Sequence, residues 1–98
     1  MSRYAARRDA NEPALVTLAR QLGAHWCPFG PLDGWIWHPR RSGWLPVEIK
    51  RPERESAADE YTAAQRRFLA WAREAQATVL IWREPDDVLR DLDARRAA

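Results

Sequence analysis

The chain has 98 residues, 46% of them hydrophobic and 31% charged, a composition that fits one globular domain and excludes an intrinsically disordered chain. Sixteen basic and fourteen acidic side chains give a formal net charge of +2, which permits a nucleic-acid partner without requiring one. The single cysteine excludes an internal disulfide and a cysteine-based zinc site, and no apolar run approaches the roughly 20 residues that cross a bilayer.

The first half of the chain predicts one helix and three strands. Residues 12–22 have the apolar spacing of a helix, with Asn11 placed to cap it and Gly23 placed to end it. Three short segments with strand-like patterns follow, and a turn-forming loop joins the last two into an antiparallel hairpin. The strands are predicted at 24–29, 35–38 and 44–50, and the hairpin loop at 39–43.

The second half predicts a loop, a helix, a strand and a last helix. Thr62 and Gln65 have the spacing of a capping box, which starts the helix of this half. We therefore predict the α/β class, in the order helix, three strands, helix, strand, helix, with a mostly antiparallel sheet and one strand returned through a helical crossover. Residues 1–98 are expected to form a single domain with frayed tails. The predicted segments are a polar loop at 51–61, a helix at 62–75, a buried apolar strand at 77–82 and a helix at 84–92.

The third predicted strand carries a charged pair on one face. Because side chains alternate along a strand, Glu48 and Lys50 share a face. A symmetric hairpin register places Asp33 opposite Glu48 on that face, with Cβ atoms roughly 5 Å apart. Two carboxylates so close repel each other, and a divalent cation between them turns that repulsion into binding energy. A bulge at Gly34 would shift this register by one residue.

Six tryptophans are many for a chain of this length. The same symmetric register places Trp37 opposite Trp44 near the hairpin tip, and Trp35 opposite Pro46. Exposed aromatic side chains of this kind stack on bases or on a second subunit. The remaining three tryptophans are expected in the core or in a dimer contact: Trp26, Trp71 and Trp82.

The carboxylates and the lysine form a pattern that resembles a known signature. Asp33, followed fifteen residues later by Glu48-Ile49-Lys50, resembles the D…(D/E)xK signature of the PD-(D/E)xK nuclease superfamily. Pro31-Leu32-Asp33 resembles its leading Pro-Asp half, with one residue inserted. Over roughly residues 8–92 the chain is most similar to the small stand-alone VRR-NUC branch, which occurs in phages and is related to Holliday junction resolvases. Three further segments carry this similarity: RDANE at 8–12, YTAAQ at 61–65 and VLIWR at 79–83.

The resemblance implies a restriction-endonuclease-like core and a Mg²⁺ site, in which Mn²⁺ would substitute. Asp33 and Glu48 would bind the ion through carboxylate oxygens. The backbone carbonyl of Ile49 would add a ligand, and Glu12 would serve as an outer or second-metal ligand. Such a set suits Mg²⁺, which prefers a few carboxylates together with water and substrate oxygens.

The resemblance also implies catalytic and DNA-binding roles. Lys50 would hold or activate the attacking water and stabilise charge on the phosphate, and Gln65 would orient water, Lys50 or a phosphate oxygen. Arg40 and Arg41, in the hairpin loop, and Arg51 are candidate phosphate contacts.

The function expected from these features is Mg²⁺-dependent endonucleolytic cleavage of DNA, with a preference for branched or flapped structures. We expect a homodimer, because a monomer of this size offers a thin platform for DNA. No organic cofactor and no membrane association are expected, and the N-terminus lacks a signal peptide, so a cytoplasmic location in a bacterium or phage-infected cell is expected. The alternatives are a non-catalytic nucleic-acid-binding or assembly module that keeps the fold, and a ribonuclease or toxin-like nuclease.

Each candidate residue also has an ordinary structural interpretation. Glu48 and Lys50 can form a solvated pair on an exposed strand, and Glu12 suits the first turn of a helix because of the helix dipole. Gln65 is explained by the capping box alone. Arg40 and Arg41 can be ordinary loop charges, and the two histidines, His25 and His38, are expected at the surface or at strand ends.

Overall fold

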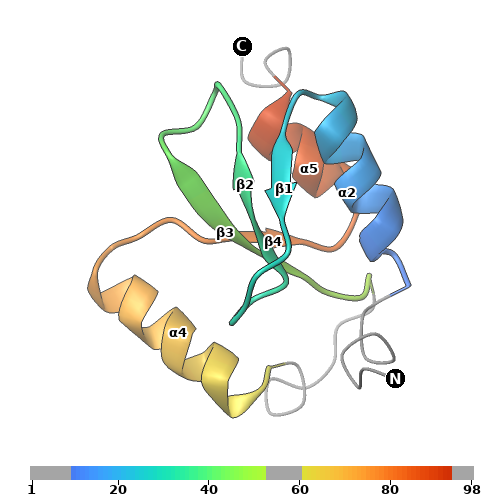
Figure 1. Ribbon diagram of the computed structural model, residues 1–98. Helices are drawn as coiled ribbons and strands as arrows, with labels where there is room; N and C mark the ends of the chain where they lie inside the picture. Colours follow the sequence, from blue (N-terminus) through green and yellow to red (C-terminus); the bar gives the residue numbers. More distant parts are fainter. Residues whose placement is uncertain (1–9, 53–60, 94–98) are drawn as a thin grey trace.

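Three helices and a four-stranded mixed sheet make up the computed structural model, which describes residues 10–52 and 61–93 (Figure 1). The strand order is β1-β2-β3-β4, with β1, β2 and β3 antiparallel and β4 parallel to β3. The predicted α/β class is therefore confirmed, and the described elements follow one another in the predicted order. The elements are α2 (Glu12–Gln21), β1 (His25–Cys27), β2 (Gly34–Trp37), β3 (Trp44–Ile49), α4 (Ala63–Glu74), β4 (Leu80–Trp82) and α5 (Pro85–Leu92).

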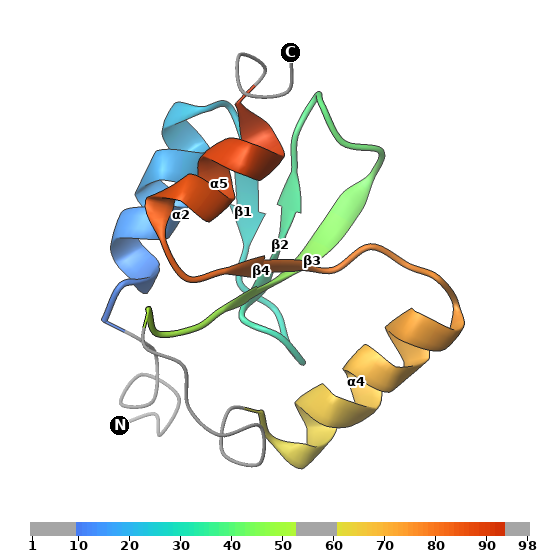
Figure 2. The same ribbon diagram turned by 180° about the vertical axis from the view of Figure 1, so that it is seen from behind.

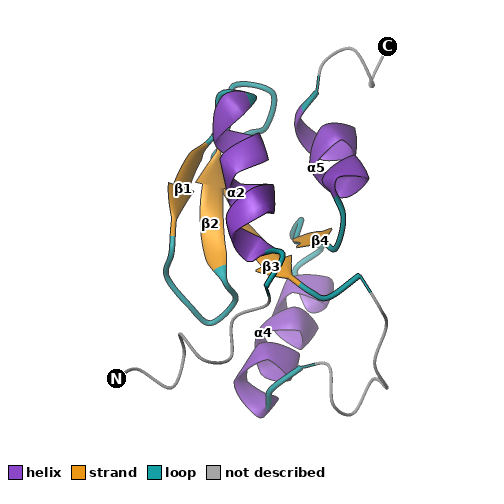
Figure 3. Ribbon diagram, turned by 90° about the vertical axis from the view of Figure 1, so that its right-hand side faces the viewer, coloured by secondary structure: helices purple, strands orange, loops and turns teal. Residues whose placement is uncertain are grey.

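The helices cover the sheet unequally. Helices α2 and α5 lie together on one side of the molecule, and α4 lies on the other side (Figures 1 and 2). The parallel pairing of β3 with β4 requires a crossover between them, and α4 is part of that crossover (Figure 3). One sheet face is thus closed by two helices, and the other is closed only in part by one.

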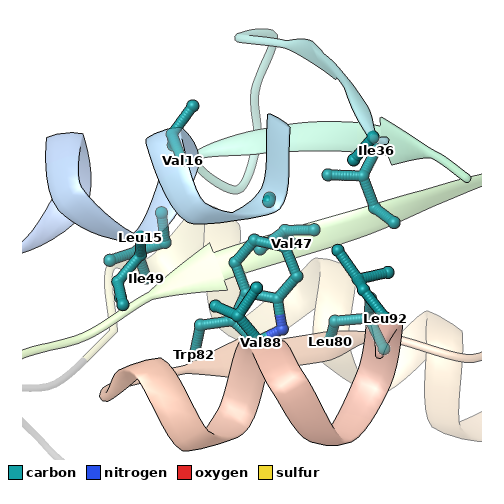
Figure 4. Close-up of a cluster of buried hydrophobic side chains, with 11 residues drawn as sticks. Leu15, Val16, Ile36, Val47, Ile49, Leu80, Trp82, Val88 and Leu92 are labelled. Carbon is teal, nitrogen blue, oxygen red and sulfur yellow. The ribbon is translucent and has the colours of Figure 1, made fainter. Parts of the chain in front are cut away.

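The core lies between the sheet and the α2–α5 pair (Figure 4). Alternation along β3 directs Val47 and Ile49 into this core, and Trp82 at the end of β4 is fully buried there. The indole Nε1–H of Trp82 donates to Asp91 Oδ2 at 2.9 Å, so the buried ring keeps a hydrogen-bond partner. The other labelled members of this cluster are Leu15, Val16, Ile36, Leu80, Val88 and Leu92.

Local sequence explains where two of the helices begin and end. Thr62 Oγ1 accepts from Gln65 N–H, and Gln65 Oε1 accepts from Thr62 N–H, each at 3.1 Å, so the predicted capping box is confirmed. Helix α2 ends at Gln21, and Gly23 follows with a φ of +98°, a conformation that favours glycine. Asn11 lies at the N-cap position of α2, but its side chain does not accept a hydrogen bond from the helix, so the predicted side-chain cap is wrong.

The hairpin register is the symmetric one. Trp37 pairs with Trp44, Trp35 with Pro46, and Gly34 with Val47, so no bulge interrupts β2 at Gly34. Asp33 directly precedes β2, and the residue after Val47 in β3 is Glu48. The register prediction is thus confirmed up to the first residue of β2, which places Asp33 beside Glu48.

One prediction about the second half was wrong in extent. The buried strand predicted at 77–82 forms only at Leu80–Trp82, and residues 77 and 78 are exposed. This strand is an edge of the sheet, so only the residues paired with β3 are held in it. Trp71, predicted in the core or in a dimer contact, is 64% exposed and so lies outside the core, and its place in a dimer contact stays a prediction. Most of the loop predicted at 51–61, and both predicted tails, lie outside the described residues.

Candidate active site

Asp33 and Glu48 hold each other through the backbone. The Asp33 N–H donates to Glu48 Oε1 at 3.1 Å, and the Ile49 N–H donates to Asp33 Oδ2 at 2.6 Å. The two carboxyl groups also lie close enough to share a hydrogen bond. The structure therefore brings together the two carboxylates that the sequence predicted as metal ligands.

Burial makes the Glu48 carboxyl unusual. Its residue is only 1% exposed, on the sheet face opposite the main core. Burial, together with the hydrogen bond and the charge of Asp33, raises the pKa of Glu48 to about 8, whereas Lys50 acts in the opposite direction. Near neutral pH without a cation, the Glu48 carboxyl therefore holds a proton, because its ionised form would be both desolvated and repelled by Asp33.

Lys50 completes a charged group of three residues. Its Nζ lies 3.1 Å from Glu48 Oε2, and the side chain is only 14% exposed. The same Nζ lies 4.5 Å from the centre of the Tyr61 ring, in a cation–π contact that positions it from the α4 side. Glu48 and Lys50 are thus not the solvated strand pair of the ordinary interpretation.

The Ile49 carbonyl faces the same side of β3 as Asp33. The Lys50 N–H donates to the Trp82 carbonyl at 2.9 Å, so the N–H and C=O of Lys50 point towards β4. These groups alternate in direction from one residue to the next along a strand. The N–H and C=O of Ile49 therefore point towards β2, as the bond of its N–H to Asp33 requires. A backbone oxygen on the side of the Asp33 carboxylate suits its predicted role as a metal ligand.

The donor set fits a hard divalent cation, but it is small. It consists of two carboxyl groups and one carbonyl, which leaves coordination positions for water and phosphate oxygens, as Mg²⁺ prefers. Within residues 10–52 and 61–93, no group of three or more His, Cys, Asp or Glu side chains could hold a metal. Glu12 is therefore not brought into one group with Asp33 and Glu48, and its role as a ligand stays a prediction.

Gln65 has a structural task at the start of α4. Its side-chain oxygen accepts from the Thr62 N–H in the capping box. That bond supports the ordinary interpretation, and the predicted orienting role of Gln65 stays a prediction. The same helix start carries Tyr61, so the capping box indirectly positions the ring that contacts Lys50.

The three arginines predicted to contact phosphate do not form one patch. Arg40 is exposed in the hairpin loop, whereas Arg41 is half-buried and lines a pocket of about 460 Å³ along the β4 edge. Arg51 is exposed beyond the other end of β3, next to Lys50, and its carbonyl accepts from Arg83 Nη1 at 2.9 Å. Of the three, Arg51 is the nearest in sequence to the charged group.

Sequence reasoning missed two residues that support the site. Asn11 Nδ2 donates to the carbonyls of Lys50 and Arg83, each at 2.9 Å, and so joins the start of α2 to the ends of β3 and β4. Tyr61 was noted only as part of a sequence similarity. In the sequence, only the positions of these two residues could have indicated their roles: Asn11 lies just before α2, and Tyr61 lies just before the capping box.

Gly34 is required by the close approach of β1. A Cβ atom at this position would lie 2.5 Å from Trp26 Cζ2 and 2.8 Å from the Cys27 carbonyl oxygen. We expect Gly34→Ala to destabilise the protein by about 1–3 kcal/mol, because the indole and a strand backbone must move. Chemical denaturation measures this loss, and Gly43→Ala is the control, since a Cβ there meets nothing within 4 Å and only backbone strain applies. An unchanged unfolding midpoint for Gly34→Ala would contradict the packing argument.

No family model matches the chain, and the comparisons with curated proteins and with solved structures found no match. Among the described helices, none combines the length and apolar character needed to span a bilayer.

Proposed function

We propose that this chain is a metal-dependent nuclease with a restriction-endonuclease-like core, which hydrolyses phosphodiester bonds in DNA. The observation that carries the proposal is the group formed by Asp33, Glu48 and Lys50, two carboxyls in contact and an ammonium 3.1 Å from one of them. A strand pair rarely buries such a group for stability, because removing charges from water costs more than their pairing returns. A divalent cation and a phosphate would offset that cost.

Each residue has a distinct part in the proposed reaction. Asp33, Glu48 and the Ile49 carbonyl would hold the cation, which when bound supplies charge stabilisation at the phosphate and acidifies water. Lys50 donates hydrogen bonds to the attacking water or to a non-bridging phosphate oxygen. Its contacts with Glu48 and Tyr61 hold the ammonium in place before substrate arrives.

Lys50 provides the direct test of catalysis. We expect the purified chain with Mg²⁺ or Mn²⁺ to cut plasmid and branched DNA, and Lys50→Ala to lose about 10²–10³-fold in rate, the usual effect of removing one charge-stabilising donor. Lys50→Arg keeps the charge and is expected to restore little, because a guanidinium is a poor proton partner. Gel assays over a metal titration measure these rates.

Arg73→Ala is the matched control for loss of a positive charge, since Arg73 is exposed at the last turn of α4. It should cut like the wild type. A wild-type chain that leaves DNA intact with either metal, or a Lys50→Ala variant that cuts normally, would refute the proposal. Offering RNA in the same assay separates the ribonuclease alternative.

The alternative function is a nucleic-acid-binding or assembly module that keeps the nuclease fold without catalysis. It is favoured by one observation, the absence of a third acidic ligand beside Asp33 and Glu48 in the part of the chain that is described. Binding of DNA without any cleavage in either metal would support it. We also propose a homodimer, since among the described residues β1 and β4 pair with no further strand and the α4 face is covered only in part, which leaves surface for a second copy.

A further inference from the structure

A row of aromatic rings crosses three strands on the half-covered face of the sheet. His25 pairs with Trp37, and Trp37 pairs with Trp44, so the three side chains lie side by side on one face. The His25 and Trp37 rings are 5.6 Å apart and tilted by 55°. We refer to His25, Trp37 and Trp44 as the aromatic row.

The aromatic row is open to solvent. Trp37 is 38% exposed, Trp44 is 51% exposed and His25 is exposed. The next row along the same face is closed, because the ring of Trp35 meets Phe68 of α4 edge-on at 6.2 Å. Helix α4 therefore reaches this face at Trp35 and leaves the row at the hairpin end accessible.

The aromatic row and the Asp33–Glu48 pair stand on the same sheet face. Trp44 and Glu48 are four residues apart on β3, and Trp37 and Asp33 are four residues apart across the start of β2. At about 3.3 Å per residue the row lies roughly 13 Å from the carboxylates. That length corresponds to about two to four nucleotides of a strand, depending on its extension.

Charge on this part of the molecule suits a polyanion. Between Glu12 and Glu48 the sole acidic residue is Asp33, and the hairpin loop next to the row carries the exposed Arg40. Acidic side chains gather instead at 84–93, around α5, which packs on the opposite face of the sheet. Helix α4 carries three arginines and one glutamate, whereas α5 carries three aspartates and one arginine, so among the described helices a polyanion is favoured on the α4 side over the α5 side.

We propose that the aromatic row binds single-stranded DNA by stacking unpaired bases on Trp37 and Trp44. Every base offers a π-face, so stacking selects single strands without reading sequence, whereas a duplex hides these faces. Together with the proposed nuclease site, on which this step rests, the row makes the substrate a DNA with an unpaired segment a few nucleotides from the cut.

Binding without metal tests the row separately from catalysis. We expect the full chain in EDTA to bind a fluorescent oligo(dT) of roughly 15 nucleotides and to show quenched tryptophan emission. The double variant Trp37→Leu with Trp44→Leu should weaken Kd at least about tenfold, as expected for loss of base stacking. Trp71→Leu, which removes a tryptophan that is 64% exposed on α4, is the matched control and should bind like the wild type.

The proposal is overturned if the double variant binds oligo(dT) normally. It is also overturned if a blunt duplex of equal length binds as tightly as the single strand, or if oligo(rU) binds where oligo(dT) does not. A wild-type dimer that becomes monomeric in the double variant, seen by sedimentation without oligo(dT) binding, would instead assign the row to self-association and would also overturn it. Far-UV circular dichroism confirms that the double variant folds. The binding assay in EDTA does not depend on cleavage. If the chain binds oligo(dT) in EDTA but does not cut DNA when Mg²⁺ or Mn²⁺ is added, only the nuclease proposal is refuted.

Discussion

Asp33→Asn and Glu48→Gln are each expected to abolish Mn²⁺ binding and to lower DNA cleavage by at least about a thousandfold, while leaving the fold intact. Each change removes one anionic oxygen from a set that has only two carboxyls, so the remaining ligands cannot hold a divalent cation. The amide oxygens still accept the backbone bonds that the carboxylates accept now, from Ile49 N–H and Asp33 N–H. The site therefore loses charge without losing its hydrogen bonds.

Isothermal titration with Mn²⁺ measures binding, and far-UV circular dichroism measures the fold. Glu74→Gln is the matched control, because it removes an exposed carboxylate at the end of α4 that has no place in the charged group. It should bind Mn²⁺ and cut DNA like the wild type. If both site variants titrate Mn²⁺ as the wild type does, the metal assignment is wrong.

The second large expected effect is a fall in the free energy of unfolding as the pH rises. Glu48 has a pKa of about 8 in the folded protein and an ordinary value near 4.5 in the unfolded chain. Between these values the folded state binds more protons than the unfolded state, so stability is highest below pH 4.5 from this group and falls as the pH rises towards 8. A shift of this size corresponds to a loss on the order of 5 kcal/mol, a large part of the stability of a small domain.

Urea denaturation in EDTA at pH 5, 6, 7 and 8 measures this slope. Glu48→Gln removes the titrating group, so its stability should be nearly flat over the range and should exceed that of the wild type at pH 8. A wild-type protein whose stability rises from pH 5 to 8, in parallel with the variant, would show that Glu48 is ionised in the folded protein without metal.

Local patterns were enough to predict most of the fold. The capping box at Thr62 and Gln65 and the glycine after α2 are short-range signals, and the structure confirms the helices that they delimit. The shortness of β4 could not be predicted, because an apolar run does not show which of its residues find a partner strand. The sequence also left Trp71 open between the core and a dimer contact, and only the packing of α4, which buries Ala72, excludes the core.

The candidate site was predictable where it depends on strand geometry and not where it depends on long-range packing. The alternation of β3 and the symmetric hairpin placed Glu48, Lys50 and Asp33 together. The bonds of Asn11 to the ends of β3 and β4 join residues 39 and 72 positions apart, and no local pattern indicates them. Gln65 had two interpretations in the sequence, and the structure shows the bond that belongs to the structural one.

The bonds of Asp33 with the Glu48 carboxylate and with the Ile49 N–H have a consequence for how an ion would enter. They extend the β2–β3 ladder by one rung in which carboxylates replace carbonyls, so both acids are held in place by the hairpin. The conformational entropy of arranging the ligands is therefore lost when the chain folds, not when a cation arrives. An incoming cation would have only to displace a proton and shed water, because its two carboxyl ligands are already fixed in place.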